Sequence, residues 1–397
     1  MHMLPLSNKI IMMVIKKDFM GDRLFMKNKV ILGLLLVSLF MSGCTSKKNI
    51  NTSETVTNQS FLETEVANNE TEITVVDETA GDIDFTDSEQ KSIDSLVKLS
   101  DGVYFMDCYN DYKLDDYLSA NIQTIEDFDR WLTNNITYGK PTGNFPDIAC
   151  CSFSTTDLDG NHLFGRNFEL SVGDSMIIRT NPENGYSSIG VVYLRNINLG
   201  VKGEYDIDDE ESKSLLLATP WGICDGINEK GFGASLLELS NRHDVVDTEK
   251  NDLLWYTVVR VVLDKCANVD EAIELLQNYD LFSGRQNTYH IFLTDATGRS
   301  VVVEWWGGEM YVIEDTAVTN LKLYEGNPIY CWRYRGMHEV IDVTPSMTSE
   351  EAMRILADVA QSGGVCWSAV YNLENFSVEV CFFEDYSQTY HYAGRLD

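Results

Sequence analysis

Residues Cys150–Glu169 read CCSFSTTDLDGNHLFGRNFE, a stretch of alternating polarity followed by turn residues and a second apolar run. This pattern predicts a β-hairpin whose turn lies at Asp157–Gly160. Successive side chains of a strand face opposite sides, so Cys150 and Cys151 cannot both point into one pocket. One cysteine is therefore a candidate nucleophile, and we expect the other to lie in the core.

The return strand of this hairpin carries a cation in the run GRNFE, Arg166. A guanidinium brought near a thiol favours the thiolate, which is the reactive form of cysteine. Taken alone, a cysteine near an arginine is more often a packing residue than a catalytic one. The pair is a hypothesis that needs support from the rest of the chain.

The hairpin resembles the start of the mature choloylglycine hydrolases and penicillin V acylases, the linear-amide branch of the N-terminal nucleophile hydrolases. In that family a cysteine becomes the first residue by self-processing, and an arginine in a G-R-N-x-D run follows it. Arg166 lies sixteen positions after Cys150, which is the spacing of the family. The resemblance implies that Cys150 is the nucleophile and that Ala149–Cys150 is the bond that is cut. Cys151 is the alternative, and it would require a one-residue deletion in the hairpin.

Further runs resemble the family in the expected order. They are DGINEKGF at Asp225–Phe232, VTN at Val318–Asn320, the helix start at Arg333 and WSAVY at Trp367–Tyr371. The resemblance implies that Asn320 donates to the oxyanion, since a neutral amide supplies N–H groups without a charge that must be desolvated. It also implies that Arg333 reaches back to the catalytic centre, with Arg335 as the alternative.

Two positions depart from the family pattern. Glu169 stands where the family has an aspartate, and we expect its carboxylate to bond the α-amine of Cys150. Its extra methylene lengthens the reach by about 1.5 Å, and a 1 Å misplacement can cost catalysis about a hundredfold. Glu238 stands where the bile salt hydrolases have an oxyanion-hole asparagine, and an ionised carboxylate cannot donate a hydrogen bond. These two departures bear on the substrate class and leave the fold prediction unchanged.

The resemblance implies an α+β fold, a four-layer αββα sandwich in which two antiparallel sheets lie between helical layers. The order of hairpins, helices and strands read from periodicity agrees with this class. The expected strands are 175–180, 189–195, two within 289–305, 310–314 and two within 365–383, and the expected helices are 253–266, 269–279, 330–343 and 348–361. Asn268 and Thr348 are the expected helix caps.

The first 44 residues have the features of an export signal. We expect translation to begin at Met26, because MKNKVILGLLLVSLFMSGC combines basic residues, an apolar run and small residues before Cys44. The run Met41–Cys44 resembles a bacterial lipobox, which implies that Cys44 is diacylated. A membrane-spanning helix is the alternative, but Val30–Phe40 is short for the roughly 20 residues that a bilayer requires.

Residues 45–90 are predicted to be a disordered acidic tether, because 51–90 contain eleven acidic residues and no Lys or Arg. Residues 91–149 show helical periodicity, followed by a loop that leads to Cys150. We expect a helical propeptide that is removed, since the α-amine base exists only after cleavage. The alternative is a helical subdomain that stays in place. Residues 150–397 form the hydrolase domain in either case.

Charge and cysteine spacing exclude several classes of protein. The formal charge of −32 includes −27 from residues 91–397 alone, so neither nucleic acid nor an anionic membrane surface is an expected partner. The nine cysteines and six histidines show no zinc-ligand spacing, and we expect neither a metal nor a cofactor. Buried free thiols are the default for the remaining cysteines.

These patterns together predict a hydrolase of non-peptide linear amide C–N bonds, carried to the bacterial cell surface as a lipoprotein. Its partners would be a small acyl-amide substrate and, through the lipid, the membrane. Self-association into a homo-oligomer stays open. One rival is a surface-anchored lipoprotein that binds acyl amides with weak or no catalysis. A papain-like protease is a second rival, and the scarcity of histidine argues against it.

Overall fold

The computed structural model describes residues 83–143, 149–239, 249–282 and 288–396. Residues 78–397 make one compact unit, and residues 1–77 lie outside the described ranges. The predicted signal segment, Cys44 and most of the predicted tether therefore lie outside the described residues. Within those residues, no helix has the length and apolar character that crossing a membrane requires.

The predicted hairpin is confirmed as β3 (Ala149–Thr156) and β4 (His162–Glu169). Its turn is held by the Asp157 carboxylate, which accepts the backbone N–H groups of Asp159 and Asn161. Gly160 takes the left-handed conformation that this turn needs, with φ +90°. Gly165 on β4 is required by packing, because a Cβ there would lie 2.4 Å from the Phe153 ring.

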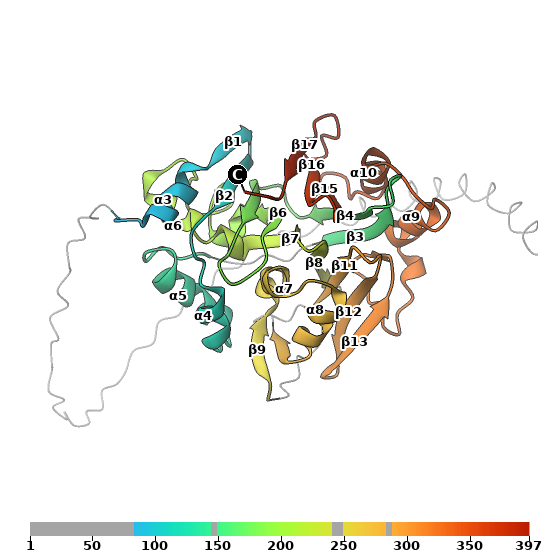
Figure 1. The fold of residues 1–397 in the computed structure, drawn as a ribbon, viewed down its shortest axis with the longest axis horizontal. Coiled ribbons are helices and arrows are strands. Elements are labelled where there is room, and N and C mark those ends of the chain that lie inside the picture. Colours follow the sequence, from blue (N-terminus) through green and yellow to red (C-terminus); the bar gives the residue numbers. More distant parts are fainter. Residues whose placement is uncertain (1–82, 144–148, 240–248, 283–287, 397) are drawn as a thin grey trace, which may run out of the picture. The chain divides into compact units, whose positions relative to one another are not determined.

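Two sheets account for most of the strands in the described residues (Figure 1). The six-stranded sheet has the order β14-β3-β4-β15-β16-β17, and the nine-stranded sheet has the order β1-β2-β5-β6-β7-β8-β11-β12-β13. The first adds β14 (Ala317–Val318), β15 (Val365–Asn372), β16 (Ser377–Phe382) and β17 (Tyr390–Ala393) to the hairpin. The second contains β1 (Val97–Ser100), β2 (Val103–Cys108), β5 (Ser175–Thr180), β6 (Ser188–Tyr193), β7 (Ile223–Asn228), β8 (Phe232–Leu239), β11 (Thr288–Asp295), β12 (Ser300–Trp306) and β13 (Glu309–Glu314).

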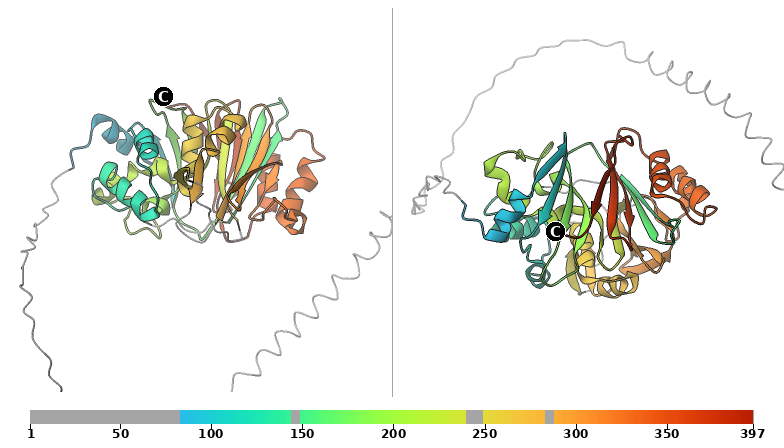
Figure 2. Two further views of the ribbon diagram at one scale, coloured as in Figure 1. Left: turned by 90° about the horizontal axis from the view of Figure 1, so that it is seen from below. Right: turned by 45° about the horizontal axis from the view of Figure 1, so that its top comes forward.

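Helices cover the outer face of each sheet, which gives the four layers that were predicted (Figures 1 and 2). Helices α7 (Val258–Lys265) and α8 (Val269–Leu276) pack on the nine-stranded sheet. Helices α9 (Trp332–Ile341) and α10 (Ser349–Asp358) pack on the six-stranded sheet. The inner faces meet directly, for example where the hydroxyls of Ser152 and Ser235 lie 2.9 Å apart.

Both predicted helix caps are present. The Asn268 side chain accepts the N–H of Glu271 at the start of α8. Thr348 and Glu351 form a reciprocal capping box at the start of α10. The helix predicted over 253–266 is shorter than expected, because the chain first forms β9 (Asn251–Leu254) and one 3-10 turn at Trp255–Thr257. β9 pairs in parallel with β10 (Tyr279–Phe282).

The segment before the hairpin is not wholly helical. It contains α3 (Asp87–Asp94), α4 (Leu114–Ser119) and α5 (Ile125–Asn135), and α5 confirms the later part of the predicted helical pattern. The prediction of helix over 96–103 was wrong, because this stretch forms β1 and the start of β2, with a turn at Gly102. A short apolar run is compatible with both a helix and a strand, and here the pairing with β5 favours the strand.

Candidate active site

The paired cysteines at the start of β3 face opposite sides of the six-stranded sheet, as predicted. Cys150 belongs to the core between the two sheets, whereas Cys151 packs with Met337 and Leu356 under α9 and α10. Both side chains are fully buried. Only the Cys150 side therefore meets the inner face of the nine-stranded sheet, where Arg166 also lies.

The Cys150 sulfur lies in a polar setting within this core. Arg166 Nη2 lies 2.8 Å from Cys150 Sγ, and the backbone N–H of Glu169 also donates to the sulfur. Burial raises the pKa of the Cys150 thiol to about 12, and the charge of Arg166 offsets part of this rise. The sulfur is therefore a thiol at neutral pH in the uncut chain, and it needs a base before it can act as a nucleophile.

Asn320, which follows β14, lies against the nitrogen of the candidate nucleophile. The backbone N–H of Cys150 donates to Asn320 Oδ1 at 2.8 Å, and Asn320 Nδ2 donates to the Glu238 carbonyl at 2.7 Å. After cleavage before Cys150 this nitrogen would be the α-amine. The Glu238 position thus contributes its backbone carbonyl as an acceptor for Asn320, and neither this carbonyl nor an ionised Glu238 carboxylate can donate to an oxyanion.

Glu169 and Arg333 form a buried ion pair beside this group. Arg333 Nη2 lies 2.5 Å from Glu169 Oε2, and Arg333 Nη1 lies 3.4 Å from Asn320 Oδ1. Burial raises the pKa of Glu169, and the opposing effects of Arg333 and Gln361 offset it only in part. In the uncut chain the Cys150 nitrogen donates to Asn320, while Glu169 faces Arg333 and Gln361. Arg335 is exposed on the outer side of α9.

Two residues that contact this group were given no role in the sequence analysis, the fully buried Asp225 and the exposed Gln361. Asp225 Oδ2 lies 3.3 Å from Arg166 Nε, and the Asp225 carboxylate also accepts hydrogen bonds from Trp367 and Tyr371. Gln361 donates both its backbone N–H and its side-chain amide to the Glu169 carboxylate. Asp225 stands in the DGINEKGF run, so its position was visible, but Gln361 lies in a turn after α10 that carries no motif.

A second buried pair fixes the chain that follows Asn320. Glu304 on β12 accepts His290 Nδ1 at 3.0 Å and the backbone N–H groups of Leu323 and Tyr324 at 2.8 and 2.9 Å. Burial favours a higher pKa for the Glu304 carboxyl, but these hydrogen bonds hold its pKa below the ordinary value. An ionised Glu304 thus ties the Leu323–Tyr324 backbone to the nine-stranded sheet.

Metal and disulfide chemistry are not evident in the described ranges. Among residues 83–143, 149–239, 249–282 and 288–396, no group of His, Cys, Asp and Glu side chains has a metal-ligating arrangement. The cysteines within these ranges are free thiols. The arrangement around Cys150 therefore offers thiol, amide, guanidinium and carboxylate groups, which are the groups that nucleophilic acyl transfer uses.

Comparison with known proteins finds similarity to linear amide hydrolases. The family model "Linear amide C-N hydrolases, choloylglycine hydrolase family" matches residues 150–358, so the match begins at Cys150. A bile salt hydrolase/transferase of Clostridium perfringens is 22% identical over 214 residues, which are 51% of this chain and 60% of that protein. The chain thus spans about three fifths of the length of this curated relative.

Solved structures of such enzymes also resemble the chain. A mutant conjugated bile acid hydrolase from Clostridium perfringens has 17% identity and a TM-score of 0.44, over 62% of this chain and 92% of that one. The penicillin V acylase from Agrobacterium tumefaciens has 17% identity and a TM-score of 0.42, over 59% and 83% of the two chains.

Proposed function

Because this chain belongs to the choloylglycine hydrolase family of linear amide C–N hydrolases, we propose that it hydrolyses the C–N bond of a small acyl amide with Cys150 as the nucleophile. One observation carries the proposal: the Cys150 sulfur lies 2.8 Å from Arg166 Nη2, and the Cys150 nitrogen lies 2.8 Å from Asn320 Oδ1. The start of the family match at Cys150 supports this residue over Cys151 as the first residue of the mature enzyme.

The reaction requires a base for the buried thiol, and cleavage of the Ala149–Cys150 bond would supply it. A free α-amine has an ordinary pKa of about 7.7–8.0, so near neutral pH it can take the thiol proton. The thiolate then attacks the acyl carbon, a C–S bond forms as the C–N bond breaks, and the α-ammonium returns its proton to the leaving amine. Water hydrolyses the thioester and releases the acid.

The surrounding residues have distinct roles in this proposal. Arg166 stabilises negative charge on the Cys150 sulfur, and Asp225 holds Arg166 in place. Asn320 orients the α-amine through its oxygen and supplies N–H groups for the oxyanion. Arg333 links Asn320 to Glu169. In the mature enzyme the freed α-amine would gain Glu169 as a second partner.

A panel of amides with different acyl groups tests the activity. It contains conjugated bile salts, penicillin V, N-acyl homoserine lactones and fatty-acyl amides, and released amine is measured for the wild type and for Cys150→Ala. We expect at least one amide to be hydrolysed by the wild type and not by the variant. Equal release by the folded Cys150→Ala protein would exclude Cys150 as the nucleophile.

The second candidate function is a lipoprotein that binds acyl amides without turnover. The Glu169 side chain favours it, because its carboxylate is engaged by Arg333 and Gln361 and replaces the shorter aspartate of the family pattern. Calorimetric binding of an amide that the wild-type protein does not hydrolyse would support this function. Hydrolysis of the same amide would exclude it.

We also propose that the protein is exported and held at the bacterial cell surface by a lipid on Cys44. The support is the sequence pattern of a basic start, an apolar run and the lipobox-like Met41–Cys44. A substrate with a fatty or steroidal acyl group would meet such an enzyme at the membrane surface.

A further inference from the structure

We propose that residues 83–143 are not discarded after cleavage before Cys150 but remain bound to the hydrolase domain as a second, non-covalently held chain. This inference rests on the proposed self-processing. It replaces the expectation of a removable propeptide with a two-chain enzyme whose smaller chain carries the N-terminal anchor.

Strand β2 of this segment is part of the nine-stranded sheet. All six of its residues are buried, and they pair in parallel with β5 from Val103–Ser175 to Cys108–Thr180. β5 lies after the cleavage point, so this pairing joins the two future chains. Removal of the segment would expose a long apolar strand edge on β5, which proteins avoid because such edges aggregate.

A buried ion pair joins the same two strands. The Asp107 carboxylate accepts Arg179 Nε at 2.6 Å and Arg179 Nη2 at 2.8 Å. Arg179 also donates to the Arg395 carbonyl near the end of the chain. Loss of Asp107 with the segment would leave the charge of a largely buried arginine without its carboxylate, which is strongly unfavourable.

An aromatic cluster extends the contact beyond the sheet. Trp221, in the 3-10 turn Thr219–Gly222 of the hydrolase domain, is fully buried. Its ring contacts four aromatic side chains of the segment, which are Tyr112, Tyr117, Phe128 and Trp131. Its indole N–H donates to the Tyr112 carbonyl at 3.1 Å. The ring therefore has its neighbours and its hydrogen-bond partner in the segment that cleavage would separate.

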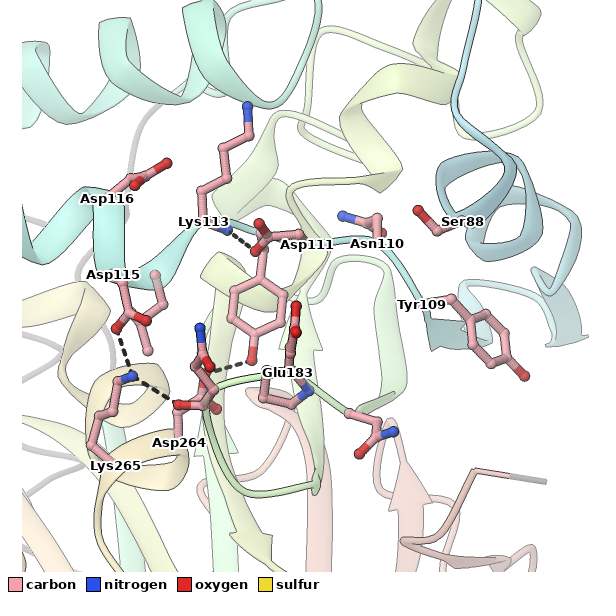
Figure 3. A pocket seen from close by; sticks show the side chains of 15 residues that line it. Ser88, Tyr109, Asn110, Asp111, Lys113, Asp115, Asp116, Glu183, Asp264 and Lys265 are labelled. Carbon is pink, nitrogen blue, oxygen red and sulfur yellow. Dashed lines mark hydrogen bonds and ion pairs between the residues drawn. The ribbon is translucent and has the colours of Figure 1, made fainter.

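Polar contacts also join the segment to α7 and to the 3-10 turn that precedes it. Tyr112 Oη donates to Asp264 Oδ2 at 2.5 Å, and the hydroxyls of Tyr117 and Thr257 lie 2.9 Å apart. Lys265 Nζ lies 2.6 Å from Asp115 at the rim of a pocket of about 390 Å³ (Figure 3). The contacts thus include paired backbone, apolar side chains and satisfied buried polar groups, as in a stable subunit interface.

The consequence concerns membrane attachment. The lipid on Cys44 and the catalytic Cys150 would belong to different chains after cleavage. If the segment is retained, the mature enzyme stays on the anchor without a covalent link to it. If it is lost, the enzyme leaves the cell surface.

The test separates retention from self-processing by means of a cut that does not depend on Cys150. A recognition sequence for a site-specific protease is placed within residues 144–148 of a Cys150→Ala chain that begins after Cys44 and carries a C-terminal tag. After complete cutting, the tagged chain is recovered by affinity and then analysed by native mass spectrometry. We expect both chains in equal amounts, in one complex that survives dilution and salt. Recovery of the folded tagged chain alone would overturn the proposal.

A pair of matched variants tests whether the β2–β5 contact carries the association. Asp107→Asn in the cut protein is expected to release the small chain faster than the unmodified cut protein does. Asp101→Asn, at a fully exposed residue of the preceding turn, is the control and should not change release. Equal release from Asp107→Asn and Asp101→Asn would show that the buried ion pair does not hold the chains. If the wild-type chain stays uncut, the proposal of self-processing fails. The proposal that the small chain is retained is still tested, because the engineered cut does not depend on Cys150.

Discussion

Asp225 is a site residue to which the sequence analysis gave no role, and the structure places it against Arg166. It lies fully buried between the sheets and accepts hydrogen bonds from Arg166, Trp367 and Tyr371. Burial raises the pKa of Asp225, while Arg166 and the two ring donors oppose that rise. Arg166 can stay beside the Cys150 sulfur because Asp225 holds its other side.

Asp225→Ala is therefore expected to disable the enzyme and destabilise it. Breaking a buried pair costs about 3–5 kcal/mol, and displacement of Arg166 should lower kcat about a hundredfold. Urea unfolding and kcat/KM measure the two effects. Asp225→Asn, which keeps an acceptor for Trp367 and Tyr371, should recover part of the stability but little of the rate. A kcat equal to that of the wild type in Asp225→Ala would contradict this role.

Glu169 should make both activity and stability depend on pH. Burial raises its pKa above the ordinary 4.5, so ionisation occurs at a higher pH than for an exposed glutamate. If the ionised form is the active one, kcat/KM falls as pH decreases through this raised pKa. The free energy of unfolding changes with pH in the opposite direction. A carboxyl group whose pKa is raised in the folded state stabilises the fold at low pH, and this stabilisation is lost as pH rises through that pKa.

Glu169→Gln is the matched variant, because it keeps the shape and removes the ionisation. We expect its kcat/KM to be lower than that of the wild type and to lack the acid limb. The stability difference between wild type and variant should shift toward the variant as pH rises from the ordinary glutamate pKa of 4.5 through the raised pKa of Glu169. An unchanged acid limb in Glu169→Gln would assign that limb to another group.

At the scale of elements, β12 and the chain after β14 act together. The Glu304 carboxylate accepts hydrogen bonds from His290 and from the backbone N–H groups of Leu323 and Tyr324, which begin three residues after Asn320. Glu304→Ala should lower kcat about tenfold to a hundredfold with little change in KM, since Asn320 loses its support. It should also cost about 1–3 kcal/mol for each polar group left buried without a partner.

Exposed Glu309, at the start of the edge strand β13, supplies the control. Glu309→Ala should leave kcat and the free energy of unfolding unchanged. If Glu304→Ala changed stability but not kcat, Glu304 would be a structural residue with no part in positioning Asn320.

Elements with a local physical signature could be predicted from the sequence. The β3–β4 hairpin has a turn that its own Asp157 and Gly160 build, and α8 and α10 begin at side-chain caps. β2 could not be predicted from its own six residues. They form a strand because they pair with β5, which lies about seventy positions later in the chain. The short β17 was missed for a different reason, because it has only four residues and none of them is fully buried.

The same distinction applies to the candidate site. Cys150 and Arg166 lie on one face of the hairpin, so their proximity follows from strand alternation and register. Glu169 lies on the same strand as Arg166 but has the opposite parity, so alternation alone does not place it beside Cys150. Asn320 and Arg333 were reached only through the resemblance to a family. Gln361, which donates twice to Glu169, stands 192 positions away in the chain and has no motif, so only the folded chain brings it there.

For the whole molecule, charge bears on the proposed anchoring. The acidic residues 91–397 carry −27 and would be repelled by an anionic membrane, so under the proposal attachment would depend on the lipid on Cys44. Cys44→Ser is expected to move both chains from the membrane fraction to the soluble fraction. Fractionation with an antibody against each chain checks this. A soluble large chain in cells with intact Cys44 would contradict retention through the small chain.

The most direct test of the central claim is the mass and N-terminal sequence of the large chain from purified protein that begins after Cys44. We expect wild-type protein to yield a large chain that begins at Cys150, and Cys150→Ser to remain one uncut chain. A chain that begins at Cys151 would place the nucleophile one residue later. A folded wild-type protein that hydrolyses an amide while uncut would contradict the N-terminal nucleophile mechanism.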